Sequence, residues 1–281
     1  SQYNQVKNCI FDGTNSSALG ISIGHTGAAS DYNLIEGCTF IPADTKLNNS
    51  KASIQFYGKN CTIRQNVFRD GSTQTPGNPL MARCIEANDA DGSLIYNNTF
   101  YNNFHAAIIM LQSCVNIAVK NNIFYKNMHL TGYGGSDEDG YKRGAQILLQ
   151  GWGIKGSLET SGNVFDYNFI QYQTAANYDP VVHVSSPLDY QYTLNEAQTN
   201  LENTFPGNNI EQTGGPKFTN ESTRVLTLES DSPCIDAGIV VNDSTWGNLP
   251  YKGSAPDMGA FEYGSDSDAP ARPTGVKIIS Q

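Results

Sequence analysis

Charged residues are scarce in this chain of 281 residues, of which only 16% are Asp, Glu, Lys or Arg. Basic residues are fewer than acidic ones: the chain has 17 Lys and Arg and 27 Asp and Glu, and the formal net charge is −10. This balance disfavours nucleic acid as a partner. The sequence also has no run of 18 or more apolar residues, so it predicts no membrane-spanning segment.

What the chain does have is a phrase of nine residues that recurs. Clear copies span residues 60–68, 92–100 and 116–124, and each ends in phenylalanine. Weaker copies end at Phe11, Phe40 and Phe165. An internal repeat indicates architecture more strongly than any local pattern, because each copy is one unit that must stack on its neighbours to bury an apolar face.

Each copy predicts two short strands joined by a sharp corner. In the first strand a β-branched residue alternates with a charged one, as in Ile63–Arg64, which puts the apolar side chain inside. Asparagine tolerates the left-handed conformation and suits the corner, and stacked asparagines can form a hydrogen-bonded ladder. The expected ladder positions lie two residues before each phenylalanine, at Cys9, Cys38, Asn66, Asn98, Asn122 and Asn163.

A third strand signal lies between the copies, for example at residues 52–56 and 106–111. The shortest spacing between repeats runs from Phe100 to Phe124, which matches one coil of a right-handed parallel β-helix. Leucine is too sparse for a leucine-rich repeat, and the period is too short for a β-propeller. The sequence therefore predicts an all-β fold: a right-handed parallel β-helix of about ten three-strand coils with an asparagine ladder at one corner.

The six cysteines include no Cys-x-x-Cys pair, so their spacing does not predict a metal site. Cys9 and Cys38 fall on the ladder position of neighbouring coils, where strands about 4.8 Å apart would permit a disulfide. Thiols stacked in the core are the favoured alternative, because free cysteine is among the most buried residue types.

The repeat resembles the pectate-lyase-like superfamily of right-handed parallel β-helix proteins. The segments 214–218, 232–238 and 255–263 are also similar to the closing block of many secreted bacterial β-helix proteins, although Gly215 stands where that block usually has Asp. The resemblance spans residues 1–263. It implies the fold more strongly than the reaction, since a fold does not supply a function.

The resemblance predicts a β-helix domain over residues 1–263 with irregular C-terminal coils. Residues 264–281 are predicted to be a linker and the start of a further module, because they are rich in Ser, Asp and Pro before an apolar stretch. We therefore expect an extracellular, cell-surface or periplasmic protein that is a monomer within a multidomain secreted chain.

Charged residues near the starts of the third strands predict a basic row. In enzymes that this chain resembles, substrate lies along that strand face. A basic row on an acidic protein would attract an anionic polysaccharide; charges that merely flank strand ends in water are the alternative. The candidate catalytic residues are Lys142, Arg143, Arg83 and His105, and the candidate substrate-binding residues are Lys51, Gln55, Tyr133, Tyr141, Gln146 and Gln150.

Acidic residues follow the same strands. Glu86 is expected to point outward, and the turn after it contains an Asp-x-Asp-Gly sequence. Because Ca²⁺ prefers six to eight oxygen ligands, the candidate metal ligands are Glu86, Asp89, Asp91, Asp137 and Asp139. The twelve-residue EF-hand pattern is not completed, and an isolated Asp-x-Asp-Gly is typical of an ordinary turn.

β-Elimination of a uronate polysaccharide uses both groups. A lyase must neutralise the uronate carboxylate, with Ca²⁺ or Arg, and then remove the C5 proton with a base. The expected base is Lys142, its pKa lowered by neighbouring Arg143, with Arg143 or Arg83 as the carboxylate partner and His105 as the alternative base. No organic cofactor is expected.

Two alternatives stay open. A glycoside hydrolase would need a carboxylate pair, such as Glu86 with Asp89 or with Asp139. A glycan-binding module without turnover would need only stacking faces and hydrogen-bonding groups, which the 15 tyrosines and two tryptophans help to supply.

Overall fold

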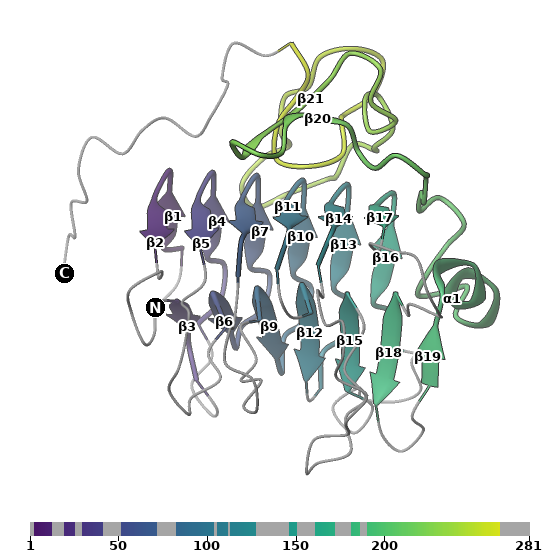
Figure 1. Cartoon of the computed structure of the whole chain (residues 1–281). Helices are drawn as coiled ribbons and strands as arrows, with labels where there is room; N and C mark the ends of the chain where they lie inside the picture. Colours follow the sequence, from purple (N-terminus) through teal and green to yellow (C-terminus); the bar gives the residue numbers. More distant parts are fainter. Residues whose placement is uncertain are drawn as a thin grey trace, which may run out of the picture.

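The computed structural model describes residues 3–12, 20–25, 30–41, 52–71, 83–103, 106–111, 113–127, 146–150, 161–171, 181–185 and 190–264. Within them the chain winds into a stack of coils, and each coil gives one strand to each of three parallel sheets (Figure 1). The predicted right-handed parallel β-helix with three strands per coil is confirmed. No helix among these residues is long and apolar enough to cross a membrane.

Sheet A contains the strand that precedes the ladder corner. Its strands in spatial order are β1 (Gln5–Lys7), β4 (Leu34–Glu36), β7 (Thr62–Arg64), β10 (Leu94–Tyr96), β13 (Ala118–Lys120) and β16 (Val164–Asp166). Neighbouring strands pair in constant register, so Ile35, Ile63, Ile95 and Val119 form one inward row. Period-2 alternation leaves the residues on either side of this row on the outer face.

Sheet B contains the strand that follows the ladder corner. Its strands are β2 (Ile10–Asp12), β5 (Thr39–Ile41), β8 (Val67–Arg69), β11 (Thr99–Tyr101), β14 (Ile123–Tyr125) and β17 (Phe169–Gln171). The repeat phenylalanines Phe11, Phe40, Phe68, Phe100 and Phe124 point inward and stack with ring centroids 4.8 Å apart. This separation equals the strand spacing, so the repeat fills the core with one ring per coil.

Sheet C completes each coil and carries the candidate site. Its parallel strands are β3 (Ile21–Ile23), β6 (Ile54–Phe56), β9 (Ile85–Asn88), β12 (Ile108–Leu111), β15 (Ile147–Gln150) and β18 (Val182–Ser185). A seventh strand, β19 (Tyr190–Tyr192), pairs antiparallel with β18 and ends the sheet.

The asparagine ladder is confirmed at the corner between sheets A and B. The side-chain amide of Asn66 donates to Asn98 Oδ1, that of Asn98 to Asn122 Oδ1, and that of Asn122 to Asn168 Oδ1, each at 3.0 Å. All four side chains are fully buried. Because each amide also bonds to backbone groups, the ladder satisfies polar groups that the corner would otherwise bury unpaired.

The left-handed conformation at this corner belongs to a different residue from the one that the sequence suggested. It is adopted by the residue before each ladder position: Gly37, Gln65, Asn97 and Asn121 have φ of 64°, 53°, 51° and 54°. The preceding residue therefore makes the turn, and the ladder asparagine directs its amide into the core.

The prediction that Phe165 marks the ladder strand of the last repeat is wrong. Phe165 lies in β16 and pairs with Val119, not with Phe124, and it stacks on Phe205. The ladder residue of this coil is Asn168, whereas Asn163 lies at the corner before β16, where it accepts a hydrogen bond from the backbone of Ile117. Both corners of this coil carry asparagine two residues before an inward apolar residue, so the local pattern alone selects the wrong strand.

All six cysteines are free, and all but Cys9 are buried. Burial raises the pKa of Cys38 and of Cys114 to about 12 in each case. The interpretation as thiols stacked in the core is confirmed, because a protonated buried thiol behaves as a small apolar side chain.

Six coils among the described residues give a strand to each of the three sheets, not about ten. Residues 204–210 add one irregular turn, in which Asn209 extends the ladder from Asn168 and Ile210 pairs with Phe169. The chain after them does not continue the stack. After β19 comes α1 (Leu194–Asn200), which begins with a capping box between Thr193 and Glu196. The chain then folds back over sheets A and B as the C-terminal block (residues 214–263; Figure 1, green to yellow), which contains the hairpin β20 (Phe218–Asn220) and β21 (Val225–Leu228). Residues 265–281 lie outside the described residues, so their assignment as a linker stays a prediction.

An apolar contact holds this block against the β-helix. Phe218 packs edge-on against the rings of Tyr101 and Tyr125 on the outer face of sheet B, and Leu226 and Met258 belong to the same buried cluster. The residues that make the ladder turn also bind the block, since Asn97 Nδ2 donates to the carbonyl of Asp257 at 2.8 Å. The block therefore covers the corner between sheets A and B.

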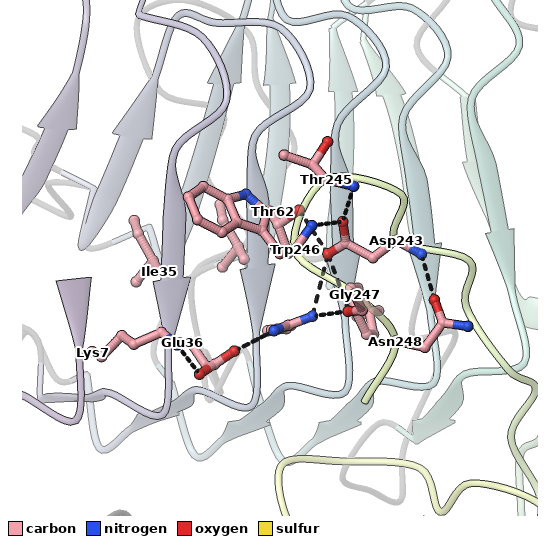
Figure 2. A network of polar contacts seen from close by, with 12 residues as sticks. Lys7, Ile35, Glu36, Thr62, Asp243, Thr245, Trp246, Gly247 and Asn248 are labelled. Carbon is pink, nitrogen blue, oxygen red and sulfur yellow. Dashed lines mark hydrogen bonds and ion pairs between the residues drawn. The ribbon is translucent and has the colours of Figure 1, made fainter. Parts of the chain in front are cut away.

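A buried ionic network anchors the block to sheet A (Figure 2). Arg64 binds Glu36 at 2.6 Å on the neighbouring strand and Asp243 of the block at 3.3 Å, and it donates to the hydroxyl of Tyr96 and the carbonyl of Gly247. Burial alone would raise the pKa of Glu36, but Lys7 and Arg64 more than offset this and lower it. The network therefore holds Glu36 ionised on one side of the guanidinium and places the carboxylate of Asp243 on the other.

The raised pKa of Glu262, in the C-terminal block, predicts that the folded protein loses stability as the pH rises from acidic to neutral. Burial, and then the charge of Asp257, raise the pKa of Glu262 to about 7. The folded protein therefore binds more protons than the unfolded chain between the ordinary glutamate pKa and about 7, so its stability falls as pH rises through this window. We expect Glu262→Gln to flatten the dependence of Tm on pH between about 5 and 7.5.

The measurement is thermal unfolding at a series of pH values. It starts above pH 5 because lowered carboxylate pKa values, such as those of Glu36 and Glu86, act below that range. The matched control is Glu202→Gln at an exposed position. An unchanged slope in Glu262→Gln would contradict the expectation.

Candidate functional site

The candidate site lies on the outer face of sheet C. In β9, Ile85 and Ala87 belong to the core, so Glu86 between them points outward, as predicted. The constant register of the sheet places Glu86 in a row across the strands. From the first coil onward, this row is Ser22, Gln55, Glu86, Ile109, Leu148 and His183.

Glu86 is the centre of a polar cluster on this face. Its Oε1 accepts hydrogen bonds from Gln55 Nε2 at 2.7 Å and from Asn88 Nδ2 at 2.9 Å, and its Oε2 forms an ion pair with Arg83. The side chains of Arg83 and Glu86 are only 15% and 6% exposed. We call Gln55, Arg83, Glu86 and Asn88 the Glu86 cluster.

The cluster holds Glu86 in its ionised form. Burial alone would raise the pKa of Glu86, but the charge of Arg83 and the hydrogen bonds from Asn88, Gln55 and Arg83 outweigh burial and lower it. A charge-assisted pair within hydrogen-bond contact is well oriented. The cluster can therefore present a fixed cation, a fixed carboxylate and two amides to a polar ligand.

The aspartates after β9 do not join Glu86. Asp89 Oδ1 accepts from the backbone of Ser113, and Asp91 accepts from the side chain of Asn116 at 3.0 Å and pairs with Lys59 at 3.6 Å. Both lie in the turn that leads from sheet C to sheet A, away from the outward row. Among the described residues no three His, Cys, Asp or Glu side chains form a group that could hold a metal ion.

With this geometry established, the comparison with known families is decisive for the fold. The model of the right-handed β-helix region matches residues 1–186, which is more than half of the chain. The chain belongs to the right-handed β-helix family. Membership of this family is consistent with a carbohydrate-active or glycan-binding protein. A search of curated proteins found no match.

Many of the residues predicted for the site of this β-helix family member lie outside the described residues. They are Lys51, His105, Tyr133, Asp137, Asp139, Tyr141, Lys142 and Arg143. Gln150 is the last residue of β15, but its side chain is not among the parts of the chain that the structure describes. The roles proposed for all of these residues stay predictions.

Gln146 occupies a position that differs from that of Gln55. Its side chain is fully buried, and its Oε1 accepts a hydrogen bond from Asn127 Nδ2 at 2.9 Å. Asn127 Oδ1 in turn accepts from Asn103 Nδ2. Gln146 therefore extends a second amide ladder, at the corner between sheets B and C, instead of facing the outer surface.

Two residues of the face were not singled out from the sequence. Asn88 bonds Glu86 from the same strand, and His183 takes the same register position in the coil of β18, where it is 2% exposed. The alternation of Val182, His183 and Val184 could have predicted that His183 lies on the outer face, because it matches the alternation around Glu86. Asn88 gave no such signal, because it ends the strand in an ordinary turn sequence.

Proposed function

We propose that this member of the right-handed β-helix family is a secreted protein that binds an acidic polysaccharide along the outer face of sheet C and cleaves it by β-elimination. The observation that carries the proposal is the buried Arg83–Glu86 pair on that face. Glu86 orients the guanidinium of Arg83, which gives a uronate carboxylate a cationic partner at a fixed position. Gln55 and Asn88 supply amide groups beside it for sugar hydroxyls.

The proposed base comes from the residues that follow β14 and precede β15. Lys142 takes the C5 proton, with Arg143 lowering its pKa as a neighbouring like charge, and His105 is the alternative base. Asp137 and Asp139 remain candidate Ca²⁺ ligands together with Glu86, whereas Asp89 and Asp91 lie in the turn away from this face. Calcium, where it binds, would neutralise the uronate carboxylate as a Lewis acid.

The state of Glu86 disfavours the hydrolase alternative with Glu86 as the acid. An inverting or retaining hydrolase needs one carboxylic acid that is protonated at working pH. The pKa of Glu86 is lowered, so this side chain is ionised and cannot donate a proton.

Binding without turnover is the second candidate. It is favoured by the ion pair in which Arg83 neutralises Glu86, whose lowered pKa keeps the carboxylate ionised. A preorganised polar cluster with no group that titrates near neutrality suits recognition better than proton transfer.

The test measures the ultraviolet absorbance of unsaturated product after the protein is incubated with polygalacturonate, alginate and hyaluronan. Because removing Arg83 alone would leave Glu86 buried without its partner, the informative variant is the double replacement Arg83→Gln with Glu86→Gln. We expect it to lower kcat/KM by about 100-fold or more, the size typical of a lost electrostatic partner in the transition state.

The matched control is Lys59→Gln, which removes an exposed cation in the turn between sheets C and A and should change the rate less than threefold, as is usual for a surface charge. Activity retained in the double variant would contradict a role for the cluster. Product formed with Ca²⁺ but not with chelator would implicate the proposed metal ligands. Retention of a polymer without any product would favour the binding module.

A further inference from the structure

The corner that leads from sheet C into sheet A has one residue per coil in the left-handed conformation. In the later coils this position is filled by residues that tolerate it. In the first two coils it is filled by tyrosine, with φ of 62° for Tyr3 and 55° for Tyr32. The later occupants are Asn60, Gly92, Asn116 and Gly162.

Tyrosine disfavours the left-handed backbone conformation of this corner. A bulky residue with positive φ is an outlier, whereas asparagine and glycine accept the conformation at low cost. Backbone strain of this kind persists where the surroundings impose it, and it concentrates at functional sites. Because Asn60 makes the same turn in the next coil, the turn itself does not require the two rings.

The two rings are stacked and accessible. Their centroids are 5.0 Å apart with an interplanar angle of 8°, and Tyr3 is 57% exposed. A third ring, that of Trp246, meets Tyr3 at 6.2 Å and 65°. We call Tyr3, Tyr32 and Trp246 the aromatic platform.

The platform is held in place by the ionic network. The backbone N–H of Trp246 donates to Asp243 Oδ1 at 2.9 Å, while Asp243 Oδ2 pairs with Arg64. Figure 2 shows the indole of Trp246 reaching from this loop over sheet A. Two segments more than 200 residues apart in the sequence (Tyr3 and Trp246) therefore meet in a fixed arrangement.

We propose that the aromatic platform is a second carbohydrate-binding site, which stacks a pyranose ring of a polysaccharide on its exposed tyrosine face. Rigid tyrosine and tryptophan rings offer a large apolar face and a polar edge at little cost in conformational entropy. These are the properties that the apolar face and the hydroxyls of a sugar ring require. The platform lies at the corner beside sheet A, so it is separate from the Glu86 cluster and does not depend on the proposed reaction.

The size of the platform favours a single ring over a second protein. A stable protein–protein interface buries about 800 Å² on each partner, whereas an aromatic side chain buries at most about 250 Å² even when it is wholly covered. Tyr32 and Trp246 are only partly exposed. The exposed area therefore matches a small ligand.

The test replaces the rings without disturbing the corner. The double variant Tyr3→Asn with Tyr32→Asn places at both positions the residue that Asn60 already supplies, so the fold should be kept. Trp246→Ala removes the third ring from the other segment. The matched control is Tyr251→Asn, which removes a tyrosine that is 43% exposed elsewhere in the C-terminal block.

The first readout is retardation in native gels that contain polygalacturonate, alginate or hydroxyethylcellulose. We expect the parent protein to be retarded by at least one polymer, and the double variant and Trp246→Ala to bind about tenfold more weakly, as expected when a stacking contact is lost. The second readout is tryptophan fluorescence in a Trp152→Phe background, in which Trp246 is the only tryptophan. The retarding polymer should shift its emission.

Several outcomes would overturn the proposal. They are no retardation of the parent protein by any polymer, retardation that persists unchanged in the double variant, and an unchanged Trp246 emission in the presence of a retarding polymer. Loss of self-association in the double variant without an effect on polymer binding would also overturn it, by assigning the platform to a contact between copies. Platform-dependent retardation without unsaturated product would support this site while the proposed reaction fails, so the two proposals are separable.

Discussion

Replacing Arg64 with methionine is expected to lower the free energy of unfolding by about 3–5 kcal/mol, the cost of breaking a buried ion pair by removing one partner. The side chain of Arg64 is 7% exposed, and that of its partner Asp243 is 1% exposed. Without the guanidinium, the carboxylate of Asp243 is buried without its cationic partner, and Glu36 is left with Lys7 alone. The hydroxyl of Tyr96 and the carbonyl of Gly247 lose their donor as well.

The loss should be local before it is global. Because Arg64 joins sheet A to the C-terminal block, we expect the loop around Asp243 to detach first. Limited proteolysis should then cut this loop faster in the variant than in the parent protein. Urea unfolding followed by circular dichroism and by tryptophan fluorescence measures the global change, and the two probes should separate if the block unfolds before the coils.

The matched control is Lys59→Met. Lys59 also pairs with a carboxylate, but its side chain is 59% exposed and its distance to Asp91 is 3.6 Å, so its removal should cost less than about 1 kcal/mol. Adding Asp243→Asn to Arg64→Met should recover part of the stability, because it removes the charge left uncompensated. A loss below about 1 kcal/mol in Arg64→Met would show that the network contributes little.

The sequence predicts the contacts of the asparagine ladder but not those of Arg64. Asn66, Asn98 and Asn122 are found from spacing alone, because stacking repeats a local pattern at a fixed position in every coil. The partner of Arg64 is Asp243, which lies 179 residues later in a segment with no repeat. No periodicity connects the two, so the ionic network is visible only in the folded chain.

The same reasoning applies to the candidate site. Alternation along β9 predicted that Glu86 points outward, and that prediction is confirmed. It could not predict that Asp89 would take a left-handed turn, with φ of 45°, and bond to the next coil. The proposed base Lys142 lies in a long stretch without alternation, where sequence alone fixes no direction for a side chain.

Replacing Asn98 with alanine is expected to cost about 3 kcal/mol or more, because it leaves several buried polar groups without partners at about 1–3 kcal/mol each. Asn98 Oδ1 accepts from both the backbone and the side-chain amide of Asn66, each at 3.0 Å. Its Nδ2 donates to the carbonyls of Ile63 and Tyr96 and to Asn122 Oδ1. Alanine keeps the backbone but supplies none of these bonds.

The position of Asn98 in the stack gives the expectation a second part. In a repeat protein each coil is stabilised mainly by its two neighbours, so a break in the middle of the ladder weakens both the coil before and the coil after it. Hydrogen exchange should therefore speed up first at the backbone N–H groups of Asn66 and Asn98, while those of β18 keep their protection longest. The control Asn195→Ala, at an exposed position of α1, should change stability by no more than about 0.5 kcal/mol. Equal effects of the two substitutions would mean that water or a shift of the corner replaces the lost hydrogen bonds. The ladder would then be a feature of the fold that contributes little to its stability.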